Sequence, residues 1–283
     1  MGVVFHVEKM NVNDFSFSIK LANSVHWDMT VRDFEFMLKL EPEGCFVLFH
    51  GGERFGIATS ISYGKVGWLG NLIVKEDSRG QGAGSILLQH VLDYLVKKGM
   101  ETVGLYAYPH LINFYETFGF KSNRELIVLH GKVSYNSSNQ VALETADKPN
   151  VDEIVNFDRQ CFGTDRKKLL KPIILEKRNL GYISNESETT TGYVLAKVQD
   201  KTAEIGPVAF KANKMKQALA LLRTAFIRLH DFETFIYIPR KETELLKIAH
   251  QAGLKEAFRA VKMIWGLNIF KNCIYTPESL ERG

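Results

Sequence analysis

The pattern of apolar and polar positions divides the chain into two stretches with the same order of elements. In the first stretch, helical spacing predicts helices over 24–41, 83–99 and 109–119. Short apolar runs bounded by turn residues predict strands over 44–49, 54–64, 67–74, 102–108 and 125–133. The turn at 50–53 joins the first two of these strands as a hairpin.

The second stretch repeats this order without repeating the residues. Helices are predicted over 149–163, 213–230 and 241–254, and strands over 181–185, 190–198, 202–210, 234–239 and 258–266. A polar passage over 132–150 lies between the two stretches and is typical of a linker. We therefore predict two α/β domains, 1–138 and 139–283, which agrees with a usual domain size of roughly 100 to 150 residues.

Composition and charge limit the classes of partner. The chain carries a net charge of +4 and 24% charged residues, and it has no long block of Lys and Arg. Nucleic acid is therefore not expected as a partner, whereas a small anionic ligand suits the sign of the charge. No run approaches the roughly 20 apolar residues of a membrane span, so we expect no membrane partner and a cytoplasmic location.

The chain has three cysteines, Cys45, Cys161 and Cys273, which are far apart in the sequence. This spacing indicates neither a disulfide framework nor a zinc site, so we expect no metal.

A glycine run follows the strand that ends at Val74. Arg79 precedes Gly80, Gly82 and Gly84 where the next helix begins. Successive backbone N–H groups without Cβ atoms can approach a phosphate closely, and the helix N-terminus adds partial positive charge. The run is not a dinucleotide fingerprint, because position 85 is Ser, and it lacks the Lys of a P-loop.

This strand, glycine run and helix resemble the acetyl-CoA-binding motif of the GCN5-related N-acetyltransferase (GNAT) superfamily. A second motif of that superfamily is matched by Tyr115, Gly119 and Phe120 in "YETFGF". The resemblance is specific over the first domain and weak over 139–283, where "FGTDR" and "IGPVAF" are similar to a two-domain subgroup with a degenerate second copy. It implies two tandem domains of the α/β (α+β) class, each with a mixed, mostly antiparallel sheet flanked by helices.

The resemblance also implies a donor site for acetyl-CoA. Its pantetheine arm would pair with the backbone of the strand end, and its pyrophosphate would lie on the glycine run. The residues concerned are Leu72, Ile73, Val74, Arg79, Gly80, Gln81, Gly82, Ala83, Gly84 and Ser85. Position 108 is Tyr where many members of the family have Asn, which removes one side-chain contact to the pantetheine arm.

Acetyl transfer to an amine needs a proton for the departing thiolate, and Tyr115 is the candidate general acid. The carbonyl would be polarised by the backbone N–H of Ile73 or Val74. The general base stays open, because the strand beside the thioester contains no carboxylate. Trp27, Asp165 and Arg166 are candidates for the acceptor side, with ion pairing or helix capping as the alternative for the last two.

The predicted function is acetyl transfer from acetyl-CoA to a primary amine, of a small molecule in the first instance. Two alternatives stay open: acetylation of a protein lysine or N-terminus, and binding of acyl-CoA without turnover by a regulatory protein. The second domain lacks the glycine run, so we predict that it binds no coenzyme A. The sequence indicates neither the acceptor nor an oligomeric state.

Overall fold

The computed structural model describes residues 5–135, 143–187, 189–269 and 273–283. They form two compact units. The first comprises the described residues up to Leu105 with Trp265–Leu267 and Arg282, and the second comprises the described residues of Tyr106–Ile264 and Asn268–Glu281 with Gly283. The domain boundary predicted after residue 138 lies outside the described residues.

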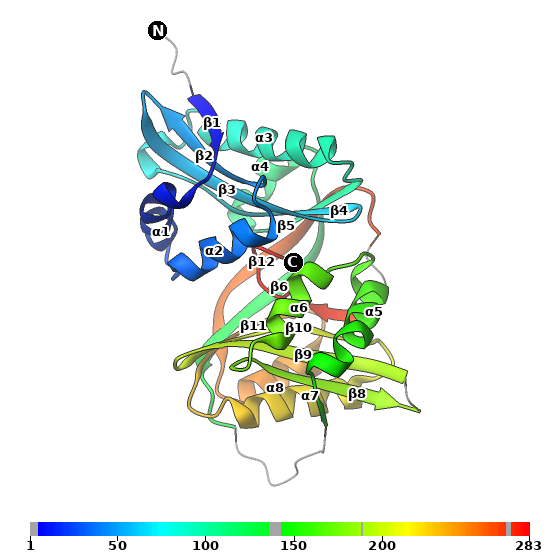
Figure 1. Cartoon of the computed structure of the whole chain (residues 1–283). Helices are drawn as coiled ribbons and strands as arrows, with labels where there is room; N and C mark the ends of the chain where they lie inside the picture. The colour runs from blue at the N-terminus through cyan, green and yellow to red at the C-terminus, as the bar shows by residue number, and fades with distance from the viewer. Residues whose placement is uncertain (1–4, 136–142, 188, 270–272) are drawn as a thin grey trace. The chain divides into compact units, whose positions relative to one another are not determined.

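The first unit is built on a sheet of five strands in the order β1-β2-β3-β4-β5. Its strands are β1 Phe5–Lys9, β2 Cys45–His50, β3 Glu53–Tyr63, β4 Val66–Val74 and β5 Thr102–Ala107. All pairs are antiparallel except β4 with β5. Its helices are α1 Phe15–Asn23, α2 Val31–Leu40 and α3 Ala83–Lys97 (Figure 1).

The second unit has the strand order β12-β6-β11-β10-β9-β8-β7, with β13 paired to β10. Its strands are β6 Lys121–Lys132, β7 Glu144–Thr145, β8 Leu180–Glu186, β9 Thr189–Gln199, β10 Thr202–Lys211, β11 Glu233–Pro239, β12 Lys255–Gly266 and β13 Cys273–Thr276. Its helices are α4 Ile112–Glu116, α5 Val151–Phe162, α6 Lys167–Leu175, α7 Met215–Arg228 and α8 Thr243–Gln251. Only the β10–β11 pair is parallel among the pairings described for this unit.

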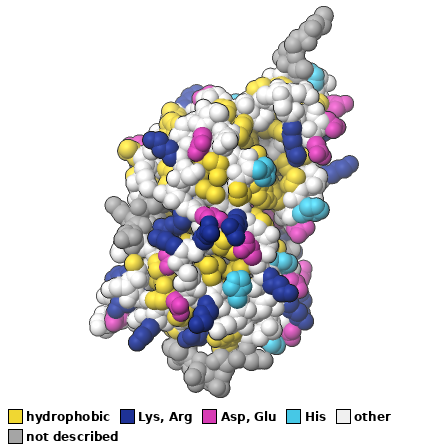
Figure 2. All heavy atoms as spheres, turned by 180° about the vertical axis from the view of Figure 1, so that it is seen from behind, with side chains coloured by type: hydrophobic (Ala, Val, Ile, Leu, Met, Phe, Trp, Pro, Cys, Tyr) yellow, Lys and Arg dark blue, Asp and Glu magenta, His cyan; other side chains and the backbone are white. Residues whose placement is uncertain are grey.

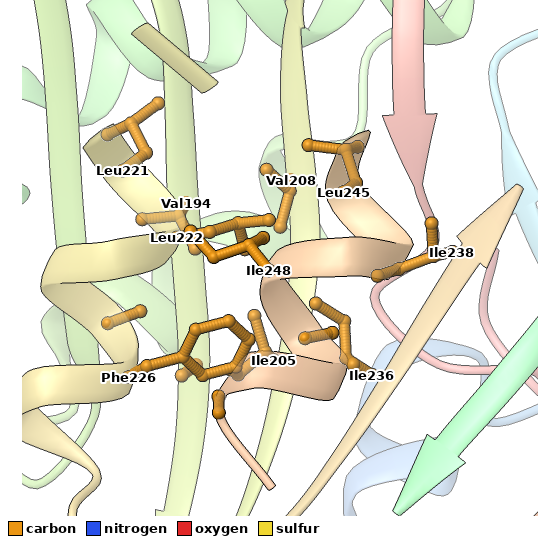
Figure 3. Packing of buried hydrophobic residues seen from close by; sticks show 14 of the residues in the cluster. Val194, Ile205, Val208, Leu221, Leu222, Phe226, Ile236, Ile238, Leu245 and Ile248 are labelled. Atoms are coloured by element: carbon orange, nitrogen blue, oxygen red, sulfur yellow. The ribbon is translucent and has the colours of Figure 1, made fainter. Parts of the chain in front are cut away.

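The main core of the second unit lies between its sheet and helices α7 and α8. Leu222 and Phe226 of α7 and Ile248 of α8 pack against strand residues such as Ile205 and Ile236, and all are buried (Figure 3). These helix residues recur at a spacing that places them on one face, as an amphipathic helix on a sheet requires. This packing stabilises the sheet where β10 and β11 are neighbours.

The predicted fold class is confirmed: the strand pairs within each unit are mostly antiparallel, and each unit carries helices. The helix predicted over 24–41 begins only at Val31. His26 and Asp28 have φ angles of +60° and +50°, which interrupt a helix, and Thr30 and Asp33 then form a capping box. Helices α1 and α6 and strands β1, β7 and β13 were not predicted.

Candidate functional site

Strand β4 leaves part of its backbone edge open. Its parallel register with β5 runs from Val66 opposite Thr102 to Trp68 opposite Gly104 and ends there, whereas β4 continues to Val74. Leu72, Ile73 and Val74 therefore have no registered β5 partner within the described residues of the first unit. An edge of this kind can accept hydrogen bonds from an added extended chain.

A β-bulge re-aims the strand just before this edge. Asn71 and Leu72 lie opposite the single residue Ala58, because the register shifts between Ile57 and Thr59. Asn71 has a φ of +48° and is buried. Its carboxamide accepts a hydrogen bond from the Thr59 hydroxyl at 2.8 Å, and its Nδ2 donates to the Met29 sulfur at 3.0 Å.

Beyond the bulge the strand is regular, which fixes where its N–H groups point. Lys75 donates its backbone N–H to the carbonyl of Phe55 on β3 at 2.8 Å. Hydrogen bonding alternates along an antiparallel pair, so the N–H of Val74 points away from β3, toward the open edge. Of the two predicted oxyanion donors, Val74 therefore has the suitable direction.

The glycine run forms the open N-terminus of α3. Gly80 and Gly82 have φ angles of +75° and +84°, and a Cβ at either position would meet nothing within 4 Å. Glycine is therefore favoured at these two positions by the left-handed backbone conformation and not by close packing. Gly82 is the N-cap without a side-chain cap, and the first intrahelical bond runs from the Ile86 N–H to the Gly82 carbonyl.

The amides of Ala83, Gly84 and Ser85 consequently point out of the helix without intrahelical partners. Gln81 stabilises the preceding turn, because its Nε2 donates to the Asp77 carbonyl at 2.8 Å. Arg79 is half-exposed, and its Nη1 lies 3.9 Å from a carboxylate oxygen of Glu76. Helix-start amides beside an exposed cation are an arrangement that can bind an anion, and anion binding here stays a prediction.

The second unit contains the same strand arrangement with its edge filled. β10 is parallel to β11 from Thr202 to Ile205, and its register with β9 then shifts between Ile205 and Val208. From Val208 to Lys211, β10 pairs with β13. A peptide strand thus occupies the edge that is open in β4, and the turn before α7 contains no glycine.

Tyr115 belongs to α4 in the second unit. Its side chain is buried, with its ring edge-on to Phe114 and Phe120. No hydrogen bond from its hydroxyl to a described residue is found. Desolvation raises the pKa of Tyr115 above its usual value, so the hydroxyl stays protonated near neutral pH.

Trp27 lies in the segment between α1 and α2, which Asn23 holds in place. The Asn23 carboxamide accepts from the Met29 N–H at 2.7 Å and donates to the Met29 carbonyl at 3.0 Å. Trp27 itself is half-buried, and its backbone N–H donates to the Ala22 carbonyl. Contact between Trp27 and an acceptor stays a prediction.

Asp165 and Arg166 have different partners in the second unit. Asp165 pairs with Arg159 and accepts from the backbone N–H of Lys167 at 2.7 Å, at the start of α6. Arg166 is fully buried and forms a two-bond pair with Asp158, at 2.9 Å and 2.6 Å. These contacts show that both residues have a structural role. Their contact with an acceptor stays a prediction.

Among the described residues, no group of three or more His, Cys, Asp or Glu side chains is arranged to hold a metal ion. Within the same residues, no helix has the length and apolar character to cross a membrane.

Comparison with known families gives two matches along the chain. Residues 14–120 match the model of the acetyltransferase (GNAT) family, and residues 154–275 match the model of an acetyltransferase (GNAT) domain. The first match contains the open β4 edge and the glycine run, and the second contains β10.

Three known proteins are similar to nearly the whole chain. The chain is 23% identical over 263 residues to holothin acyltransferase of Pseudoalteromonas sp. (strain SANK 73390), covering 91% of this chain and 87% of the relative. A putative acetyltransferase of Pyrococcus horikoshii has a similar structure, with a TM-score of 0.81, 19% identity and coverage of 99% and 96%. A tandem GNAT protein from the clavulanic acid biosynthesis pathway gives a TM-score of 0.63, 11% identity and coverage of 93% and 98%.

The two family matches, one on each half of the chain, and the full-length structural similarity lead to one conclusion. This chain belongs to the GNAT acyltransferase superfamily and is of its tandem type.

Proposed function

We propose that this protein transfers an acetyl group from acetyl-CoA to the primary amine of a small molecule, and that the first GNAT domain binds the donor. The observation that carries the proposal is the difference between the two strands β4 and β10. Strand β13 pairs with this edge of β10, whereas residues 72–74 of β4 have no registered β5 partner within the described part of the first unit. The pantetheine arm of coenzyme A is an extended chain with amide groups.

The glycine run supports the same placement of the donor. The free amides of Ala83, Gly84 and Ser85 suit the pyrophosphate, and Arg79 supplies a charge-assisted bond. The N–H of Val74 would polarise the thioester carbonyl. A single oxyanion-hole donor is worth about 3 to 4 kcal/mol of transition-state stabilisation in enzymes where a side-chain donor has been removed.

In the proposed reaction, the neutral amine forms a bond from nitrogen to the carbonyl carbon, and the carbon–sulfur bond then breaks. The Tyr115 hydroxyl donates its proton to the departing thiolate, and the amine proton passes to water. Burial keeps Tyr115 protonated, as a proton donor must be. The sequence relative in Pseudoalteromonas is named for acyl transfer to holothin; we extend the acyl transfer, and not that acceptor, to this chain.

The test is release of free thiol from acetyl-CoA with a panel of small amines, amino acids and peptides, measured for the parent protein and for Tyr115→Phe. We expect turnover with one class of small amine and a loss of about a hundredfold or more in kcat for the variant, with acetyl-CoA affinity retained in calorimetry. Turnover with peptides alone would favour a protein substrate. Tight binding without turnover across the panel would overturn the proposed reaction in favour of a regulatory acyl-CoA-binding protein.

A further inference from the structure

Two cysteines that lie more than 100 positions apart in the sequence meet in the second unit. Cys161 belongs to the last turn of α5, and Cys273 is the first residue of β13. Helix α5 contacts β13, which is the red arrow beside α5 in Figure 1. Their spacing in the sequence predicts no disulfide, whereas the structure brings the two thiols together.

The end of α5 and the strand β13 are both held in place. The ring of Phe162, the last residue of α5, lies 5.8 Å from the ring of Tyr275 in β13. On its other side β13 is paired antiparallel to β10, with Cys273 registered opposite Lys211. The two cysteines are therefore neighbours because helix packing and strand pairing fix the segments that carry them.

The two thiols differ in acidity and in exposure. The Cys161 thiol donates a hydrogen bond to the Cys273 sulfur, which lowers the pKa of Cys273 and raises the pKa of Cys161. Lys211 also favours the thiolate of Cys273, while desolvation and the Asp158 carboxylate oppose it. Cys273 is partly exposed, whereas Cys161 is buried. A thiolate that a solute can reach thus lies beside a protonated thiol, which is the arrangement of an attacking and a resolving cysteine.

The third cysteine lacks these features. Cys45 is buried in β2 of the first unit, where desolvation and Glu41 raise the pKa of its thiol to about 12. Over the face shown in Figure 2, Lys and Arg side chains are interspersed with Asp and Glu side chains, so this face has no broad basic field that would activate thiols in general. The reactivity of Cys273 therefore depends on its own neighbours.

We propose that Cys161 and Cys273 form a reversible disulfide on exposure to a hydroperoxide. The Cys273 thiolate attacks the O–O bond, which leaves a sulfenic acid on Cys273 and releases hydroxide, and the hydroxide takes up a proton to give water. The Cys161 sulfur then attacks the sulfenic sulfur, and the Cys161 proton leaves with the hydroxide as a second water. Both sulfurs are oxidised and the peroxide is reduced, and a dithiol restores the two thiols by exchange.

The disulfide would join α5 to the strand that fills the edge of β10. It would close a loop of more than 100 residues, and cross-links across long loops stabilise a protein by restricting its unfolded chain. This modification goes beyond the proposed function and needs no step of acetyl transfer.

The experiment counts the free thiols of the full chain before and after treatment with hydrogen peroxide. Thiols are titrated in denaturant with a chromogenic disulfide reagent, and peptide mass spectrometry locates any linked pair. The proteins are the parent, Cys161→Ala, Cys273→Ser and, as a control in the first unit, Cys45→Ala. Thermal unfolding is compared between the oxidised and reduced forms of each protein, so that the effect of the substitution itself cancels.

We expect the parent to lose two of its three free thiols, to yield one linked pair of Cys161 with Cys273, and to recover all three with dithiothreitol. The oxidised parent and Cys45→Ala should melt about 5 °C or more above their reduced forms, and the other two variants should show no such rise. In Cys161→Ala, dimedone should trap a sulfenic acid on Cys273, whereas Cys161 should stay unmodified in Cys273→Ser.

Three free thiols after oxidation, a linked pair that includes Cys45, or disulfides between chains would overturn the inference. Irreversible oxidation of Cys273 to a sulfinic acid while Cys161 stays free would overturn it as well. The measurements on the parent decide the question even if a variant does not fold. Failure here would leave the acetyltransferase proposal intact, because the readouts are thiols and melting temperatures and not turnover.

Discussion

Arg166 is the centre of a buried hydrogen-bond network in the second unit. Its guanidinium is bound by Asp158, and its Nη1 donates to the carbonyl of Gly283. Tyr193 also donates to Asp158, and Tyr275 donates to the Gly283 carbonyl at 3.1 Å. A charge in such a position is stabilised only while all partners are present.

We predict that Asp158→Asn lowers the free energy of unfolding by about 3 to 5 kcal/mol, because it leaves Arg166 buried without a counter-charge. The measurement is urea unfolding followed by circular dichroism. The control is Arg159→Gln, which breaks the exposed pair with Asp165 and should change stability by no more than about 1 kcal/mol. Equal effects of the two substitutions would contradict the structural role assigned to Arg166.

The raised pKa of Tyr115 predicts how kcat/KM depends on pH. Its raised pKa means that the hydroxyl keeps its proton beyond the ordinary value of about 10. The acceptor amine loses its proton as pH rises, so kcat/KM should rise and then level off, without an alkaline fall below about pH 10. The check is the pH–rate profile of the parent from pH 6 to 10, and a fall centred near pH 8 or 9 would show that another acid serves the thiolate.

At the scale of elements, the bulge in β4 depends on a residue in the left-handed region. Asn71→Gly removes the carboxamide but permits the φ of +48°, whereas Asn71→Ala removes the carboxamide and adds strain. We predict that the Ala variant is less stable than the Gly variant by about 1 kcal/mol in urea unfolding and binds acetyl-CoA more weakly. Equal stability of the two variants would contradict the claim that the left-handed backbone conformation at position 71 limits the stability of the bulge.

The N-terminus of α3 offers a matched pair of glycines. Gly82 and Gly52 have φ angles of +84° and +83°, and neither has an atom within 4 Å of an added Cβ. Each Gly→Ala substitution should cost about 1 kcal/mol of stability through strain. Only Gly82→Ala should also weaken acetyl-CoA in calorimetry, because Gly52 lies in the β2–β3 hairpin. Loss of affinity in both variants would mean that general destabilisation is responsible.

The sequence predicted the elements that carry the donor site because their signals are local. From Leu72 to Lys97 the chain passes directly from the end of an apolar strand to glycines with a left-handed backbone and then to an amphipathic helix. Strand β13 has only four residues, and α6 contains Pro172, which argues against a helix in the sequence. The pairing of β13 with β10 joins residues more than 60 positions apart, and no local pattern can reveal it.

The site residues show the same limit. The glycine run could be assigned from its own order, whereas the buried pair of Arg166 with Asp158 required knowledge of which side chains meet. Lys262, which is buried, gives another example. Its sequence neighbours read as an ordinary strand, and only the register of β12 with β6 places it opposite Arg124.

At the scale of the whole molecule, the chain repeats one fold and uses the two copies differently. The edge of β4 is open and is followed by an uncapped helix with free amides. The corresponding edge of β10 is filled by β13, and the following turn has Lys214 at the N-cap of α7, paired with Glu186. One copy therefore has an edge suited to the donor, and in the other copy strand β13 occupies the equivalent edge.

The number of acetyl-CoA molecules bound per chain tests this account most directly. Calorimetric titration of the full chain should give one site, and Gly82→Ala should weaken that site without exposing another. Two equivalent sites per chain, or a single site that Gly82→Ala leaves unchanged, would contradict the assignment of the donor to the first domain.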